Sequence, residues 1–371
     1  MKQSIVIITN LYPLPWQPTR ATFNFQQFSL LAQEYDVHIL IPVAFPDWLK
    51  HRKQIKPESN IKIVPYVYLP KFGRRFYSTL MYWSLKFTAW SWLKKINPTK
   101  LLASWAYPDG VAAQKLATDL NCHFYLKVHG SDINIHATFP ARSKQIVKMA
   151  NHANGILSVS KDLAKKMTYL GVKEEKIEVI YNGVNLDKFT PTQNIETHTP
   201  YILFIGNLKK EKGVIELLQA FKIINDKYPQ LRLKYIGSGS MLSQLQSISK
   251  QLCLESKVDF EGVKPHDELP CWLGNATLLA LPSYNEGVPN VVLESMACGV
   301  PVVASAVGGI PEVVTKNTGC LAKEITPESI ATQLELSLNS TWDKTKIRAH
   351  AMQFNWANNI QKLALLLSRE K

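Results

Sequence analysis

The sequence predicts an α/β protein built from two doubly wound domains, each with a parallel sheet. Three observations support this prediction. The chain has 371 residues, whereas a single hydrophobic core stops growing at about 250–300 residues. Short β-branched runs alternate with longer helical patterns, as in parallel sheets that helices cover on both faces. This alternation stops near residue 190 and restarts near residue 201.

The first half of the chain contains nearly continuous apolar runs between turn-forming residues. The runs expected to be strands are 4–9, 37–43, 61–66, 100–105, 123–128, 155–160 and 176–181, with helices over 21–34 and 110–120. The first run is too short for a signal sequence or a membrane span. Five dispersed cysteines without a Cys-x-x-Cys pair favour a reducing compartment. We therefore expect a cytoplasmic protein.

The second half repeats the alternation after a stretch rich in turn formers, "TPTQNIETHTP". Its expected strands are 201–207, 231–237, 258–262, 276–282 and 300–305, with helices over 213–227 and 240–252. The expected organisation is a first domain over 1–189, a linker over 190–200, a second domain over 201–352, and an amphipathic stretch, about 353–371, that can pack back on the first domain. Open parallel sheets bind ligands at the carboxyl ends of their strands, so we expect a central cleft that both domains face.

The charge of the chain favours an anionic partner. Lysine and arginine outnumber acidic residues 43 to 29, giving a net charge of +14. Residues 71–95 contain six basic and eight aromatic residues and no acid. This composition suits the surface of an anionic membrane, but an ordinary helix that covers a sheet would also place bulky side chains in the core. No nucleic-acid-binding module is present, so nucleic acid is not an expected partner.

The stretch "YNEGVPNVVLESMACGVPVVASAVGGIPEVV", residues 284–314, is the most informative part of the sequence. Asn290 is expected to cap a helix over 291–298, with Gly299 as its stop signal. The first amides of that helix would lie at the end of strand 276–282 and form an anion site.

Glu286 and Glu294 flank this helix start. A capping box would need its acid at Leu293, so Glu294 is one position out of register and Glu286 precedes the helix. Either the two carboxylates simply favour the positive helix end, or they accept hydrogen bonds from hydroxyl groups on both sides of a bound anion. A nucleotide sugar offers that second pattern, because its diphosphate lies between a sugar and a ribose.

This stretch resembles the donor-site signature of the family-four retaining glycosyltransferases, which have two Rossmann-like domains (the GT-B type). That signature is E-x(7)-E followed by G-x-P-V-V-A-S and a Gly-Gly turn. Other segments match the family in order: "GNLKKEKGVIELLQAF" (206–221), "KVHGSDIN" (127–134) and "YNGVNLDKF" (181–189). Residues 12–27 and 104–113 resemble the subgroup that builds bacterial surface polysaccharides. The resemblance spans nearly the whole chain.

The resemblance implies roles for individual residues. Glu294 would accept from the ribose hydroxyls, Glu286 would contact the transferred sugar, Lys212 would neutralise the leaving diphosphate, and His129 would hydrogen bond to the donor sugar. The donor would also be held by the segment with Gly206 and Asn207 and by the amides of Gly287, Val288, Asn290 and Val291.

Three features depart from the family pattern or stay ambiguous. Asn207 stands where the family has an arginine, so a bidentate phosphate clamp is lost unless Lys209 or Lys210 replaces it. Ala21 replaces a glycine of the acceptor loop, and the neighbouring Arg20 is either a contact for an anionic acceptor or a surface charge. Gly237 and Gly239 form a weak dinucleotide signal and are interpreted as a tight turn from strand to helix.

The predicted reaction is transfer of a sugar from a nucleotide-sugar donor, with uridine as the expected base, to a glycan or lipid-linked acceptor. The chain contains no Asp-x-Asp triplet, so we expect no metal and no other cofactor. The family retains anomeric configuration. Two alternatives remain open: a non-catalytic partner subunit of the same fold, and a nucleotide-sugar epimerase-hydrolase. Peripheral attachment to the inner face of the plasma membrane is a further hypothesis.

Overall fold

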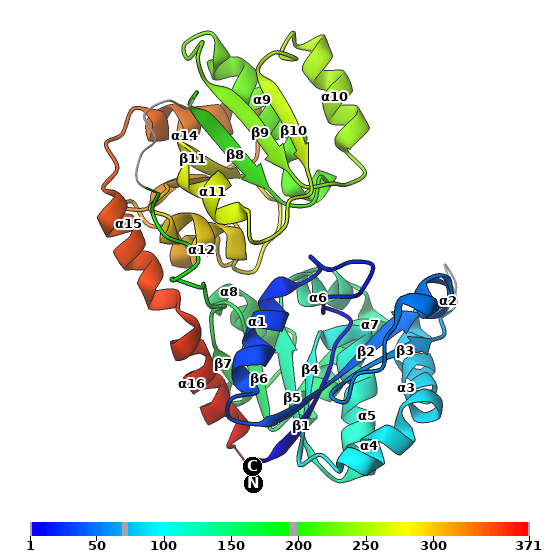
Figure 1. Ribbon diagram of the computed structural model, residues 1–371. Helices are drawn as coiled ribbons and strands as arrows, with labels where there is room; N and C mark the ends of the chain where they lie inside the picture. Colours follow the sequence, from blue (N-terminus) through cyan, green and yellow to red (C-terminus); the bar gives the residue numbers. More distant parts are fainter. Residues whose placement is uncertain (1, 69–72, 193–198, 370–371) are drawn as a thin grey trace. The chain divides into compact units, whose positions relative to one another are not determined.

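The computed structural model describes residues 2–68, 73–192 and 199–369 and confirms the predicted fold class (Figure 1). The chain forms two compact units: the first contains Met1–Tyr181 and Asn359–Lys371, and the second contains Asn182–Asn358. Each unit has its own parallel sheet. Most of the stretch expected to be a linker, 190–200, lies outside the described residues.

The first unit has a seven-stranded sheet within the described residues, in the order β3-β2-β1-β4-β5-β6-β7. Its strands are β1 Ser4–Ile8, β2 Asp36–Ala44, β3 Ile61–Tyr66, β4 Lys100–Ser104, β5 His123–Val128, β6 Gly155–Ser158 and β7 Ile177–Val179. Its α-helices are α1 Thr22–Leu31, α2 Phe45–His51, α3 Tyr77–Thr88, α4 Trp90–Ile96, α5 Val111–Leu120, α6 Ser131–Asn134, α7 Pro140–His152, α8 Lys161–Tyr169 and, from Asn359 on, α16 Trp356–Leu367.

Both faces of this sheet are covered, which explains its nearly continuous apolar strands. Helices α3, α5 and α7 neighbour one another on one face, and α1 and α16 cover part of the other (Figure 1). Successive side chains of β5 alternate between these faces. Tyr125 and Lys127 point to the side of α1 and α16, where the Tyr125 hydroxyl donates to the Leu367 carbonyl at 2.8 Å.

The second unit has a six-stranded sheet within the described residues, in the order β10-β9-β8-β11-β12-β13. Its strands are β8 Tyr201–Ile205, β9 Arg232–Ile236, β10 Val258–Gly262, β11 Leu278–Leu281, β12 Val302–Ser305 and β13 Gly319–Ala322. Its α-helices are α9 Val214–Asn225, α10 Leu242–Gln251, α11 Leu269–Gly274, α12 Asn290–Ala297, α13 Ile310–Val313, α14 Pro327–Leu338 and α15 Lys344–Ala351. The strand order matches the pattern of the first unit.

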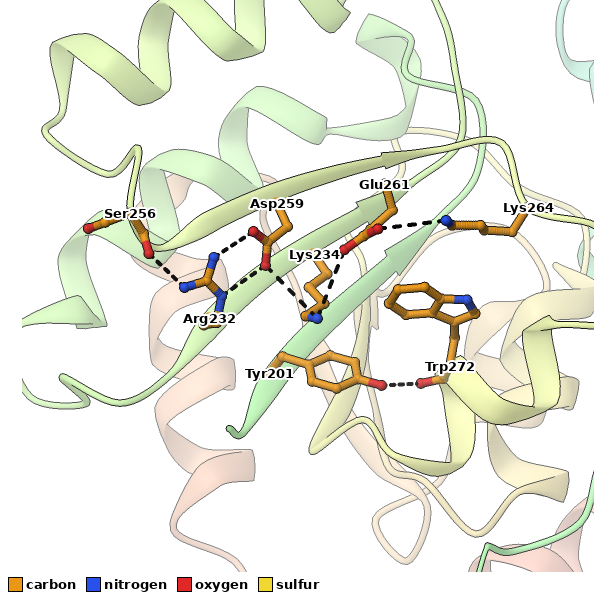
Figure 2. Close-up of polar contacts among 8 residues, drawn as sticks. All are labelled: Tyr201, Arg232, Lys234, Ser256, Asp259, Glu261, Lys264 and Trp272. Carbon is orange, nitrogen blue, oxygen red and sulfur yellow. Dashed lines mark hydrogen bonds and ion pairs between the residues drawn. The ribbon is translucent and has the colours of Figure 1, made fainter. Parts of the chain in front are cut away.

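The edge of this sheet at β9 and β10 has one apolar and one charged face. Tyr235 and Phe260 stack on the apolar side, where α9 packs. On the other side Arg232 pairs with Asp259, its Nε 2.8 Å from Oδ2. Figure 2 shows that this pair belongs to a larger charged cluster, which also contains Lys234, Glu261, Lys264 and the ring of Trp272. Charges of opposite sign compensate one another here, so the cluster covers the sheet without a long helix.

Two expectations about elements were wrong in detail. Helix α12 begins at Asn290 instead of after it, and Pro289 is the N-cap, because the Asn290 side chain accepts a hydrogen bond from Asn182 instead of capping. Strand β13 was not predicted. Among the described residues, no helix is both long enough and apolar enough to cross a membrane.

Candidate active site

The start of α12 is the centre of the site in the second unit. The helix follows β11 and a loop that carries Glu286, and the amides of Asn290 and Val291 in its first turn have no intrahelical acceptor. Val288 is buried, and Gly299 ends the helix with φ of +73°, as expected. The first turn therefore offers two free donors at the carboxyl end of a parallel strand, the place where such sheets bind anions.

Lys212 and Glu286 form an ion pair, with Nζ 2.6 Å from Oε1. Their side chains are only 25% and 11% exposed, so the pair is shielded from water and is stronger than a surface pair. The main chain supports it, because the Tyr284 amide donates to the Glu211 carbonyl at 2.9 Å. The structure thus brings together two residues that the sequence assigned to neighbouring parts of one ligand.

Two glycines allow this arrangement. Gly213, directly after Lys212, has φ of +64°, and a Cβ there would lie 2.0 Å from the Pro282 carbonyl oxygen. Gly308 has φ of +55°, and its Cβ would lie 1.9 Å from the Glu286 carbonyl oxygen. The next amide, that of Gly309, donates to the Gly287 carbonyl at 2.9 Å. The Gly-Gly turn therefore holds the Glu286 loop by close backbone contact, which any side chain would prevent.

Glu294 is buried on α12 and accepts a hydrogen bond from His266, with Oε1 2.9 Å from Nε2. The other ring nitrogen of His266, Nδ1, lies 2.8 Å from Nζ of Lys188. A lysine ammonium can only donate, so Nδ1 accepts and the proton of a neutral ring is on Nε2, facing Glu294. Lys188 also pairs with Asp267. A lysine thus determines which histidine nitrogen faces the carboxylate.

His266 and Lys188 were not predicted as site residues. A lone histidine in a loop carries no spacing signal, and Lys188 lies in the segment 181–189, where the resemblance pointed to a turn only. Arg348 of α15 holds this turn by donating to the carbonyls of Leu186 and Phe189, at 2.9 and 2.7 Å. The same guanidinium donates to the Ala297 carbonyl at the end of α12, so the turn and the helix share one anchor.

Gly206 and Asn207 follow β8 directly, and Asn207 is exposed. The turn after β9 packs against them: Gly237 has φ of +138°, and a Cβ there would lie 1.9 Å from the Gly206 carbonyl oxygen. This confirms the tight turn expected at Gly237 and Gly239. Lys209, like Lys210, is exposed in the same loop.

His129 lies in the first unit, directly after β5, as the sequence predicted. Its Nε2 is 2.8 Å from Oγ of Ser104, and its ring packs between Phe23 and Trp105. Burial and the nearby Lys127 ammonium hold the pKa of His129 well below its ordinary value. The ring is therefore neutral at physiological pH. Arg20, also in this unit, is partly buried and donates to Oε1 of Gln17 at 3.0 Å.

The structure therefore assembles Lys212, Glu286, Glu294 and the first turn of α12 within one unit. The environment of His129 belongs to the other unit.

Comparison with known proteins identifies the family. Residues 29–188 match the family model described as "Glycosyltransferase Family 4", and residues 187–354 match "Glycosyl transferases group 1". The chain is similar to the putative teichuronic acid biosynthesis glycosyltransferase TuaC of Bacillus subtilis, with 26% identity over 88% of this chain and 87% of that protein. An uncharacterized glycosyltransferase of Methanocaldococcus jannaschii is 30% identical over 68% of this chain and 70% of that protein.

Matches to other curated relatives cover less of their length, for example 52% of AmsK from Erwinia amylovora. The fold is similar to that of HepE from Anabaena, solved in complex with UDP and glucose, with a TM-score of 0.76, 18% identity, and coverage of 98% of this chain and 99% of that one. The two family models together cover the chain from residue 29 to residue 354, across both sheets. The chain thus belongs to the glycosyltransferases of family 4 and group 1 and is a glycosyltransferase with the GT-B fold.

Proposed function

We propose that this glycosyltransferase transfers a hexose from a UDP-sugar to a glycan or lipid-linked acceptor in the biosynthesis of a surface polysaccharide. It would do so with retention of configuration and without a metal ion. Named relatives act in such pathways: TuaC in teichuronic acid biosynthesis and AmsK in amylovoran biosynthesis. The observation that carries the proposal is the arrangement of two carboxylates, the half-buried Glu286 and the buried Glu294, on either side of the first turn of α12.

In the proposed donor complex, different residues bind different parts of the nucleotide sugar. The amides of Asn290 and Val291 would hold the diphosphate, together with Lys212, whose ammonium has three protons and can bind Glu286 and a phosphate oxygen at once. Glu294 uses Oε1 for His266, which leaves Oε2 for a ribose hydroxyl. Glu286 and His129 would contact the transferred sugar, and Lys209 or Lys210 would supply the positive charge that Asn207 lacks.

In the proposed reaction the bond between the anomeric carbon and the diphosphate oxygen breaks while the acceptor oxygen attacks from the same face. The acceptor proton moves to the leaving phosphate oxygen. Lys212 and the helix amides would stabilise the charge that develops there. The absence of an Asp-x-Asp triplet supports a reaction without metal. Nowhere in the part of the chain that the structure describes do three or more histidine, cysteine, aspartate or glutamate side chains gather in a way that could hold a metal ion.

A donor screen followed by kinetics tests this function. One UDP-sugar should raise the melting temperature by an amount set by its concentration over its dissociation constant. The same sugar should be transferred or slowly hydrolysed. Glu294→Ala should lower kcat/KM about 10- to 100-fold, because it removes a charged hydrogen-bond acceptor. Glu335→Ala is the matched control, since Glu335 forms an exposed pair with Lys227 on the second unit.

The products separate the alternatives. Tight binding without turnover of any donor would favour a non-catalytic partner subunit, and release of an epimerised free sugar would favour an epimerase-hydrolase. Full activity of Glu294→Ala would contradict the proposed donor site. Activity that is lost on dialysis against a chelator and restored by adding a divalent metal ion would contradict the metal-independent reaction.

We further propose that α3 and α4 contact an anionic membrane, where a lipid-linked acceptor would lie. The core side of these helices is aliphatic, with Met81, Leu85 and Leu93 buried. Trp83 and Phe87 are 53% and 85% exposed, so the alternative that the aromatic residues simply fill the core does not hold for these two. Lys86 lies over the Trp90 ring, with Nζ 3.3 Å from its centroid.

Flotation with phosphatidylglycerol vesicles tests this contact. The wild type should float with these vesicles and not with neutral ones, because each basic residue near an anionic surface contributes about 1 kcal/mol. Combining Trp83→Ala with Phe87→Ala should weaken binding, whereas Tyr169→Ala, which removes an exposed aromatic residue on α8, should not. No flotation of the wild type at low salt would overturn the proposal.

A further inference from the structure

A buried polar network in the first unit connects a lysine to His129. Its members come from four elements and the residue after β5, and no role proposed above uses the lysine. Lys127, Asn24, Gln27 and Ser104 are all 0% exposed.

The amino group of Lys127 lies in the core without a counterion and is in its charged form below its pKa. Its Nζ donates to Oδ1 of Asn24 at 3.0 Å and to Oε1 of Gln27 at 2.6 Å, and it lies 5.5 Å from the centre of the Phe23 ring. No carboxylate of the described residues lies within ion-pair distance of it. Burial lowers the pKa of Lys127 to about 7. An apolar side chain would fill this position at less cost, so stability does not explain the lysine.

The ammonium and the acceptors on the far side together determine the orientation of both amides. Because it can only donate, the oxygen atoms of Asn24 and Gln27 must face it, and their NH2 groups must point away. Both NH2 groups have matching acceptors there: Asn24 Nδ2 donates to the Leu11 carbonyl at 2.8 Å, and Gln27 Nε2 donates to Oδ1 of Asn359 at 2.6 Å. The amide orientations are therefore consistent throughout the network.

The orientation of Asn24 decides where the Ser104 proton lies. Oγ of Ser104 is 3.4 Å from Oδ1 of Asn24 and 2.8 Å from Nε2 of His129. If the serine proton pointed at His129, two oxygen atoms would face each other in a dry site without a hydrogen between them. With the proton toward Asn24, the serine oxygen accepts from His129 instead, and both contacts are hydrogen bonds.

We propose that Lys127 is a positioning residue that, through Asn24 and Ser104, holds His129 in the tautomer with its proton on Nε2. The remaining nitrogen, Nδ1, is then the ring's acceptor, and it would receive a hydrogen bond from a hydroxyl of the transferred sugar. This last step rests on the function proposed above, whereas the tautomer does not.

Removing the ammonium should change the hydrogen bonds of Asn24, Ser104 and His129. In Lys127→Met the Asn24 amide is held by the Leu11 carbonyl alone, so in part of the molecules it can turn and direct its NH2 group at Ser104. The serine hydroxyl can then rotate and donate to Nε2 of His129, and the single ring proton is then on Nδ1. His129 would present a donor where the wild type presents an acceptor.

Nitrogen NMR of the protein with 15N-labelled histidine tests the proposal directly. The signals of His129 are assigned by their loss in His129→Gln. The wild type should show the proton on Nε2, and Lys127→Met should show it moved to Nδ1 or shared. Lys100→Met is the matched control, because Lys100 is also buried but lies at the opposite end of the neighbouring strand β4; it should leave the His129 signals unchanged.

A wild-type proton on Nδ1, or identical spectra for wild type and Lys127→Met, would overturn the proposal. So would an equal change in Lys100→Met. If Lys127→Met does not fold, Ser104→Ala tests the same relay. Without the serine oxygen as acceptor, the ring proton of His129 should again be on Nδ1 or shared between the two nitrogens. Kinetics then separate the positioning of His129 by Lys127 from the contact of His129 with the sugar. The kcat of Lys127→Met should fall about tenfold, because about one hydrogen bond to the sugar is lost. A shifted tautomer with unchanged kcat would refute the sugar contact of His129 and leave its positioning by Lys127 supported.

Discussion

Two histidines, one in each unit, depend on a lysine in different ways. In the second unit Lys188 contacts His266 directly and also pairs with Asp267. In the first unit Lys127 contacts neutral amides only, and two further groups separate it from His129.

The contrast shows two ways to fix a histidine tautomer with a donor-only side chain. Near the surface a carboxylate compensates the lysine charge, so direct contact costs little. At Lys127 no carboxylate of the described residues lies within ion-pair distance, and the charge is stabilised by amide oxygens and aromatic rings. We therefore expect the buried Lys127 to lower the free energy of unfolding more than the half-buried Lys188 does.

The largest expected effect is therefore a pH-dependent stability difference between wild type and Lys127→Met. The ordinary pKa of lysine is 10.5 and that of Lys127 in the folded chain is about 7. Between these values the unfolded chain binds a proton that the folded chain has released, so the free energy of unfolding of the wild type rises with pH. Relative to the variant, the wild type should gain up to about 4 kcal/mol between pH 7 and 10.

Urea unfolding at several pH values measures this difference. The side chains that face Lys127 from α1, β4 and α16 are neutral, and the titratable neighbour is His129, which stays neutral across the window because its pKa is lowered. A difference that does not change with pH would show that the lysine keeps its ordinary pKa and stays charged in the folded chain, which would contradict the expectation.

The next effect concerns the direct pair in the second unit. His266→Ala removes the hydrogen-bond donor of Glu294, whose side chain is only 11% exposed. The unpaired carboxylate should lose its orientation toward the ribose, and the donor kcat/KM should fall about 10- to 100-fold. Steady-state kinetics measure this loss. His152→Ala is the control, because His152 is exposed and contacts only the Lys148 carbonyl; a loss of the same size there would contradict the assignment.

The sequence predicted twelve of the thirteen strands that the structure describes, because their apolar runs are bounded by turn formers. It missed β13, Gly319–Ala322, which has four residues and none that is β-branched. This strand forms because β12 offers it a complete set of partners from Val302 to Ser305. Such a strand is determined by tertiary pairing and not by local sequence.

For the site, the sequence predicted residues but not their partners. Glu286, Glu294 and Lys212 follow from a long motif, whereas the ion pair of Lys212 and the contact of Glu294 with His266 depend on the path of the chain. Lys127 did leave a signal. A lysine inside the apolar run 123–128 points to the covered face of a strand, and a charge there requires a buried set of acceptors.

The smallest expected effect is that of Lys188→Met. The variant frees Nδ1 of His266 to take the ring proton, so Nε2 would donate to Glu294 for only part of the time. Because Glu294 keeps a partner in part of the molecules, the donor kcat/KM should fall about three- to tenfold, less than in His266→Ala. NMR should show a mixture of His266 tautomers. If Lys188→Met changes His266 less than Lys127→Met changes His129, relayed control of the tautomer is the stronger of the two; a larger change at His266 would make direct contact the stronger.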